Sequence, residues 1–187
     1  MFREAITAGT PLGLRAGAHM TGGSLVPDEI AVALLDERLA KDDAQNGFLL
    51  DGFPRTLPQA EALEGRLSAE GTRVDAVVAL EAPEDLLIVR LVDRMTCSRC
   101  AASYNRASRP PRTPGICDEC QSALLARSDD EAVTVRQRLA AYHAKTEPVL
   151  KFFGARGWPV RAVSSVGGLD EVYARVKQAV VGIRGAV

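Results

Sequence analysis

The stretch that decides the fold is residues 46–59, N-G-F-L-L-D-G-F-P-R-T-L-P-Q. Its apolar run, residues 48–50, has a glycine close by on each side, a pattern typical of a short, buried parallel strand. Asp51 would end this strand, and residues 52–54 would turn the chain sharply. Arg55 is then expected at the carboxyl end of the strand, where open α/β sheets bind their ligands.

Asp51 and Arg55 have side chains that suit a phosphate and its metal ion. Mg²⁺ prefers carboxylate and water oxygens, and a guanidinium group holds phosphate oxygens through paired hydrogen bonds. The alternative is an ordinary salt bridge within the loop. A helix is predicted to follow from about Pro58, with Gln59 in its first turn.

Other patterns predict a mixed α/β chain. Helices are expected at residues 1–8, 14–20, 27–41, 84–94, from 131 onward and 169–181, and strands at 74–80 and 160–163. The apolar face of the helix at 27–41 is expected to consist of Ile30, Leu34, Leu35 and Leu39. The helix at 84–94 is apolar on nearly every side, which predicts that it is buried. Arg90 and Arg94 would lie four residues apart on one of its faces, and they need either a nucleotide polyphosphate or acidic side chains as partners.

Four cysteines form two C-x-x-C pairs, Cys97 with Cys100 and Cys117 with Cys120. A redox pair would explain one such motif but not two, and this spacing is typical of zinc ribbons. The intervening residues 101–116 are rich in proline and poor in apolar side chains. This segment cannot form a core of its own and needs a cross-link such as a bound metal ion to stabilise it. We therefore expect a structural Zn²⁺ ion with all four coordination positions filled by the protein.

Length and charge restrict the class of protein. The 187 residues suffice for one domain with a small insertion, and the formal net charge of −1 gives no reason to expect nucleic acid or a membrane surface as a partner. No signal peptide is visible near Met1, so the default expectation is a cytoplasmic protein.

The run G-F-L-L-D-G-F-P-R-T, with P-Q-A shortly after it, resembles the monophosphate-binding core of adenylate kinases, and the cysteine quartet resembles the lid of the long, zinc-binding bacterial type. The resemblance implies an α/β fold with a P-loop-kinase-like parallel sheet, flanking helices and an inserted zinc-ribbon lid. It also implies the reaction of ATP with AMP to give two ADP, with Mg²⁺ accompanying ATP, and a monomeric enzyme.

The resemblance assigns roles to residues by position. The AMP-binding set would be Arg3, Leu25, Val26, Gly52, Phe53, Pro54, Arg55, Gln59, Arg127 and Arg138. The ATP-binding set would be Arg90, Arg94, Ser103, Tyr104 and Gly167. The catalytic set would be Asp51, which organises the magnesium ion through water, with Arg94, Arg127 and Arg138, which neutralise the transferring phosphates. Without the resemblance, Arg3 would be interpreted as a solvated surface residue, and Arg127 and Arg138 each as part of a surface ion pair.

The family pattern begins with a strand and a glycine-rich phosphate loop ending in lysine, and neither occurs in this sequence. The N-terminal strands and the P-loop are therefore expected to be missing, and the chain as written is expected to have little phosphotransferase activity. The corresponding division is an incomplete AMP-binding arm at 1–26, a core at 27–92 and 131–187, and the lid at 93–130. The alternative function is a non-catalytic remnant that binds zinc and AMP.

Overall fold

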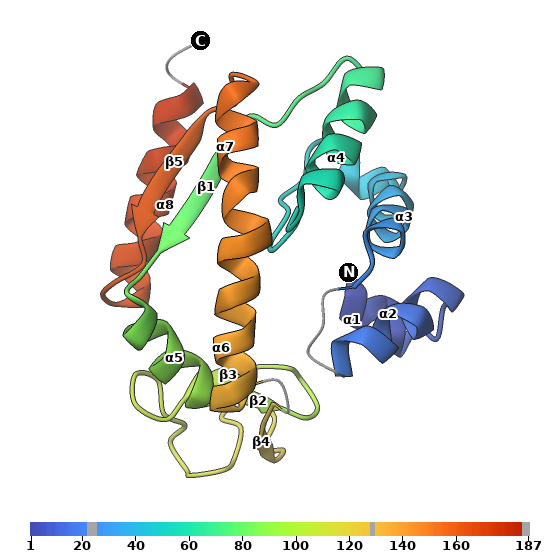
Figure 1. Cartoon of the computed structure of the whole chain (residues 1–187). Coiled ribbons are helices and arrows are strands. Elements are labelled where there is room, and N and C mark those ends of the chain that lie inside the picture. Colours follow the sequence, from blue (N-terminus) through green and yellow to red (C-terminus); the bar gives the residue numbers. More distant parts are fainter. Residues whose placement is uncertain (22–25, 128–129, 185–187) are drawn as a thin grey trace. The chain divides into compact units, whose positions relative to one another are not determined.

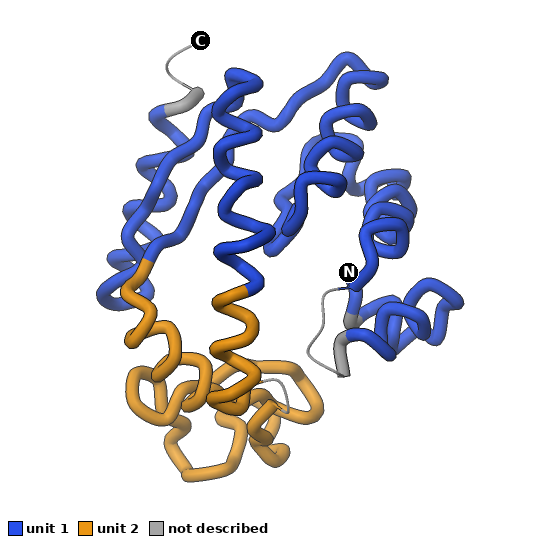
Figure 2. Tube along the Cα trace, in the orientation of Figure 1, with its two compact units in different colours: residues 1–81, 141–187 blue, residues 82–140 orange. Residues whose placement is uncertain are grey.

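A computed structural model of the protein describes residues 1–21, 26–127 and 130–184. The chain folds into two compact units (Figure 2). Unit 1 combines residues 1–81 with 141–187, and unit 2 is the intervening segment 82–140. Each unit has a hydrophobic core of its own.

Unit 1 combines helices with a parallel strand pair (Figure 1). In chain order its elements are α1 (Phe2–Thr7), α2 (Pro11–Thr21), α3 (Asp28–Leu39), the 3₁₀ turn η1 (Asp42–Ala44), α4 (Leu57–Ala69), β1 (Val77–Glu81), the π-helical turn η3 (Tyr142–Thr146), α7 (Glu147–Ala155), β5 (Val160–Ser164) and α8 (Leu169–Arg184). Strands β1 and β5 pair in parallel, from Val77 opposite Val160 to Glu81 opposite Ser164. Helices α7 and α8 both pack against this pair.

The core of unit 1 joins α3, α4 and α7. The face of α3 predicted from its 3.6-residue period is buried as expected, at Ile30, Leu34, Leu35 and Leu39. Helix α4 buries Gln59, Ala60, Leu63 and Leu67, and α7 buries Val149 and Phe153. The ring of Phe153 stacks on Trp158, with 4.6 Å between ring centroids. These helices therefore hold the segment between α3 and α4, which contains the candidate site, against a packed core.

The prediction of a buried strand at residues 48–50 is wrong. This run belongs to no strand or helix; Leu49 is 87% exposed and Phe48 42% exposed. An apolar run gains from becoming a strand only where a neighbouring strand pairs with it. In the described part of unit 1, the sheet contains only β1 and β5, and neither of these pairs with the run. The strand predicted at 160–163 is confirmed as β5, while the one predicted at 74–80 begins later, at Val77.

Unit 2 is built around a small antiparallel sheet. Its elements are α5 (Glu84–Val92), β2 (Arg94–Cys97), β3 (Ser103–Asn105), β4 (Leu124–Ala126) and α6 (Ala132–Ala141), the last of which ends in unit 1. The strand order is β3-β2-β4. The core side chains of the sheet are Met95, Cys97, Tyr104, Cys117 and Leu124. Two of the four cysteines thus belong to the hydrophobic core itself.

Two expectations about the helix at 84–94 are wrong. Helix α5 ends at Val92, so Arg94 lies in strand β2 and does not share a helix face with Arg90. None of the α5 side chains is buried, and Val89 is 51% exposed. An apolar helix is buried only when neighbours cover it, and the core of unit 2 forms around the cysteines and not around α5.

No helix in the described ranges combines the length and the apolar character needed to cross a membrane.

Candidate functional site

The loop before α4 presents Arg55 at the surface of unit 1. The chain bends at Asp51 and Gly52, and Gly52 has a φ of +69°, a left-handed conformation that favours glycine. The peptide bond between Phe53 and Pro54 is cis. The Arg55 guanidinium folds back over the bend, and its Nε donates a hydrogen bond of 2.7 Å to the Gly52 carbonyl oxygen. The exposed Asp51 and Arg55 are thus separated by one tight turn.

Both peptide groups of Arg55 are held by side chains from other elements. Its backbone N–H donates to Oε1 of Gln59 at 2.8 Å. Its carbonyl oxygen accepts a hydrogen bond of 2.9 Å from the hydroxyl of Thr146, which lies in the π-helical turn η3. The backbone position from which the Arg55 side chain extends is therefore fixed from two sides.

Behind Arg55 lies a buried polar network. The carboxylate of Asp28, at the start of α3, accepts from the Gln59 amide at 2.7 Å and from the Thr56 hydroxyl at 2.8 Å. The Thr56 hydroxyl also caps α4 by accepting from the backbone N–H of Gln59. Gln59 is 3% exposed and Thr56 8% exposed. Asp28 is a site residue that sequence reasoning missed, because its place in a helix first turn was sufficient to explain it.

The remaining predicted residues of unit 1 are spread over several elements. Phe53 belongs to the main core, and Val26 packs against the cluster that joins α2 and α3. Arg3 lies in α1, and Gly167 lies in the turn after β5 with a φ of +111°. Leu25 lies outside the described residues. Of the predicted AMP-binding residues in unit 1, the structure brings residues 52–55 and Gln59 together.

In unit 2, two of the predicted arginines converge on one buried carboxylate. Arg94 donates from Nε to Oδ2 of Asp130 at 2.8 Å and from Nη2 to Oδ1 at 2.6 Å. Arg138 donates from Nη1 to the same Oδ1 at 3.1 Å. Asp130 is 4% exposed, while the side chains of Arg94 and Arg138 are 22% and 34% exposed. One buried carboxylate therefore holds two guanidinium groups close together.

The other predicted residues of unit 2 lie in α5 and in or next to its three-stranded sheet. Arg127 donates from Nε to the Thr96 hydroxyl at 3.0 Å, and Arg90 is half-buried in α5. Ser103 is exposed on β3, while Tyr104 beside it is buried. The Tyr104 side chain therefore points into the core of unit 2, and it is the hydroxyl of Ser103 that faces outward.

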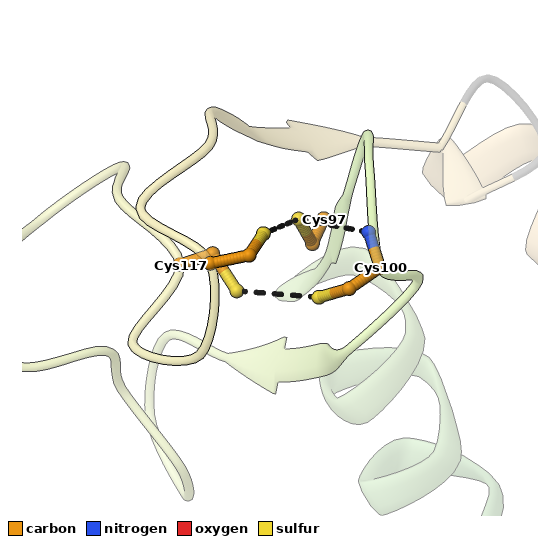
Figure 3. Close-up of side chains that lie close together, drawn as sticks. Cys97, Cys100 and Cys117 are labelled. Carbon is orange, nitrogen blue, oxygen red and sulfur yellow. Dashed lines mark hydrogen bonds between the residues drawn. The ribbon is translucent and has the colours of Figure 1, made fainter.

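The four cysteines lie together in unit 2, as their spacing predicts. Their Sγ atoms all lie within 4.8 Å of one another, with 3.3 Å between Cys97 and Cys120 and 3.5 Å between Cys100 and Cys117. Figure 3 shows three of these side chains with their sulfur atoms turned toward one another. Four thiolates around Zn²⁺ at about 2.3 Å would be about 3.8 Å apart, so only small shifts are needed. The cluster can hold a tetrahedral metal ion.

The Tyr104 hydroxyl contacts both the cysteine cluster and the backbone next to it. Its hydroxyl lies 3.6 Å from Sγ of Cys117 and accepts a hydrogen bond of 2.9 Å from the backbone N–H of Asp118. With that acceptor position in use, the hydroxyl proton is available to Cys117. A donor to a ligating sulfur is typical of the second shell of metal sites.

The thiol pKa values show how charge is distributed in the cluster. Hydrogen bonds from the side chain and backbone of Ser122, and from Cys97, lower the pKa of Cys120 to about 6. Burial opposes ionisation of Cys117, but donors led by the Tyr104 hydroxyl outweigh it and lower its pKa. A backbone N–H favours the Cys100 thiolate, yet burial and the neighbouring sulfur atoms raise its pKa to about 12. The thiols of Cys117 and Cys120 thus ionise more readily than an ordinary cysteine and favour a bound cation. A metal ion would displace the protons that remain on the other cysteines.

These features agree with the comparison of the chain with known proteins. The family model described as adenylate kinase matches residues 1–158. The chain belongs to the adenylate kinase family. It is 50% identical over 157 residues to the adenylate kinase of Moorella thermoacetica, covering 84% of this chain and 72% of the relative. It is 44% identical to those of Carboxydothermus hydrogenoformans, over 96% of this chain and 83% of the relative, and Bacillus subtilis, over 98% and 84%.

Membership of the adenylate kinase family gives the chain a nucleotide phosphotransferase function. It favours phosphoryl transfer over the alternative of a non-catalytic remnant. The exposed Arg55 and the cationic cluster of Arg94 and Arg138 are the two described features that suit such a reaction, because phosphoryl transfer depends on positioning and on neutralising phosphate charge.

Proposed function

We propose that the chain takes part in reversible phosphoryl transfer from ATP to AMP, with AMP bound on unit 1 through Arg55. The observation that carries the proposal is the Arg55 loop. There, an exposed guanidinium lies on a backbone that Gln59 and Thr146 hold from two sides. A guanidinium pre-positioned in this way loses little freedom on binding a phosphate, which is the requirement for tight, oriented binding. Leu25 and Val26 would contact the adenine base of AMP, and Arg3 would make a second contact to its phosphate.

The phosphate-handling residues of unit 2 are proposed to be Arg94, Arg127 and Arg138. The ATP-binding residues are proposed to be Arg90, Ser103 and Tyr104 of unit 2 and Gly167 of unit 1. Asp130 holds the guanidinium groups of Arg94 and Arg138 in fixed positions beside one carboxylate. Charge on the transferring phosphoryl oxygens is stabilised best by cations whose positions are fixed before the reaction.

Two metal ions belong to the proposal. The four cysteines would hold a structural Zn²⁺ ion, and the expected lid, residues 93–130, would be shaped by it. The exposed carboxylate of Asp51 would hold the water shell of the Mg²⁺ ion that accompanies ATP and shields its phosphate charge. We also propose that the protein acts as a monomer in the cytoplasm.

The proposed AMP site is tested by exchanging Arg55→Ala and measuring AMP binding by calorimetry. A charge-assisted hydrogen bond contributes about 1.5–3 kcal/mol, so the dissociation constant should rise tenfold or more. Arg38→Ala is the matched control, because Arg38 forms an exposed ion pair with Asp43 in the same unit. Equal AMP affinity in the wild type and Arg55→Ala would remove Arg55 from the site.

A further inference from the structure

We propose that Asp28 is a positioning residue of the monophosphate site: its carboxylate fixes which way round the Gln59 amide lies, so that the site accepts one class of purine. The inference deepens the proposed function and rests on it. Asp28 lies at the first residue of α3, and Gln59 lies in the first turn of α4. The contact between them joins two helices that are 31 residues apart in the chain.

One oxygen of Asp28 makes both contacts. Its Oδ1 accepts from Nε2 of Gln59 at 2.7 Å and from the Thr56 hydroxyl at 2.8 Å. An ionised carboxylate accepts hydrogen bonds and cannot donate them. The end of the Gln59 amide that faces Asp28 must therefore be its NH₂ group.

The contact at the other end of the Gln59 amide requires the same orientation. Oε1 of Gln59 accepts from the backbone N–H of Arg55 at 2.8 Å, and that group can only donate. A reversed amide would bring oxygen against carboxylate and NH₂ against N–H. Gln59 is 3% exposed, so water cannot relieve either mismatch. The amide has one permitted orientation, and Asp28 and Arg55 both enforce it.

A fixed amide matters for the choice of base. After the bonds to Asp28 and Arg55, Gln59 retains one N–H and one oxygen lone pair. A 6-aminopurine presents a donor where a 6-oxopurine presents an acceptor, and glutamine pairs with a purine edge through both ends of its amide. An amide free to reverse would accept both kinds of purine. One held in a single orientation accepts one of them.

The test compares the affinities of the whole chain for AMP and GMP by calorimetry. In Asp28→Asn, the new side chain can present either oxygen or NH₂ to Gln59, so reversing the amide creates one mismatch, at the Arg55 N–H, where the wild type has two. We expect the ratio of the two affinities to fall about tenfold. Glu29→Gln is the matched control, because it removes the same charge from the same turn of α3 at an exposed position. Its affinity ratio should equal that of the wild type.

A second variant separates positioning from general stability. Thr56→Val removes the other donor to Asp28 and the cap of α4, so it should lower the melting temperature. It leaves Gln59 between Asp28 and Arg55, so the AMP to GMP affinity ratio should stay at the wild-type value. Should Asp28→Asn fail to fold, Asp28→Ala removes the carboxylate acceptor altogether and leaves only the Arg55 N–H to orient the Gln59 amide, so the affinity ratio should fall in the same direction.

Two results would overturn the inference. The first is an unchanged affinity ratio in the folded Asp28 variant, and the second is an equal fall of the ratio in Thr56→Val. Absence of AMP binding by the wild-type chain would be a different result, because it would overturn the proposed function itself.

Discussion

Asp130 is the residue on which the cationic cluster of unit 2 depends. Replacing it by asparagine removes the charge that Arg94 and Arg138 share, and the remaining amide oxygen can pair fully with only one of them. A hydrogen bond to a charged group contributes about 1.5–3 kcal/mol. We therefore expect Asp130→Asn to lower the free energy of unfolding by an amount in this range, measured by urea denaturation. Asp43→Asn, which breaks the exposed pair with Arg38, should change it little; equal losses in the two variants would contradict the central role of Asp130.

Tyr104 is expected to tune the metal site through Cys117. Tyr104→Phe removes the hydroxyl that faces the Cys117 sulfur and keeps the ring that fills the core. Loss of a second-shell hydrogen bond typically lowers metal affinity about 10–100-fold. Competition with a coloured chelator would measure the change for Zn²⁺. Tyr173→Phe, on the exposed side of α8, should have no effect, and unaltered Zn²⁺ affinity in Tyr104→Phe would remove the hydroxyl from the second shell.

At the scale of elements, α7 contributes a buried aromatic side chain to the core of unit 1. Its Phe153 is 3% exposed and stacks on Trp158, the single tryptophan of the chain. Truncating a buried phenylalanine to alanine costs about 3–5 kcal/mol. We expect Phe153→Ala to shift the urea midpoint of unit 1, followed by Trp158 fluorescence, to a much lower concentration. Val181→Ala, at a 59% exposed position in α8 of the same unit, is the control and should leave the midpoint nearly unchanged.

The elements also show what sequence can predict. The buried face of α3 follows from spacing along one helix, and the cysteine cluster follows from two short motifs, so both were predictable. The run at 48–50 has the composition of a strand but no pairing partner in the described residues, and composition cannot supply one. Asp28 and Thr146 were missed because their partners at the site lie 28 to 31 and 91 residues away. Which polar groups meet over such distances depends on how the helices pack.

At the scale of the whole molecule, the two separate cores predict separate responses to metal removal. The cysteines form part of the core of unit 2, whereas unit 1 has its own core around Phe153. Because metal binding at such a site supplies folding free energy, a strong chelator should expose residues 97–120 to proteases. Trp158 fluorescence should stay unchanged, since it reports on unit 1. A simultaneous loss of both signals would show that the units unfold together.

The division of the chain also has a consequence for how the protein is made. Unit 2 is one continuous segment, whereas unit 1 needs residues from both sides of it. During synthesis, which proceeds from the N-terminus, unit 2 can close before the later half of unit 1 exists. Strand β1 must wait for β5, and the carbonyl of Arg55 must wait for Thr146, 91 residues later. We expect the growing chain to fold its cysteine-containing unit first and to complete the loop of Arg55, the proposed monophosphate site, last.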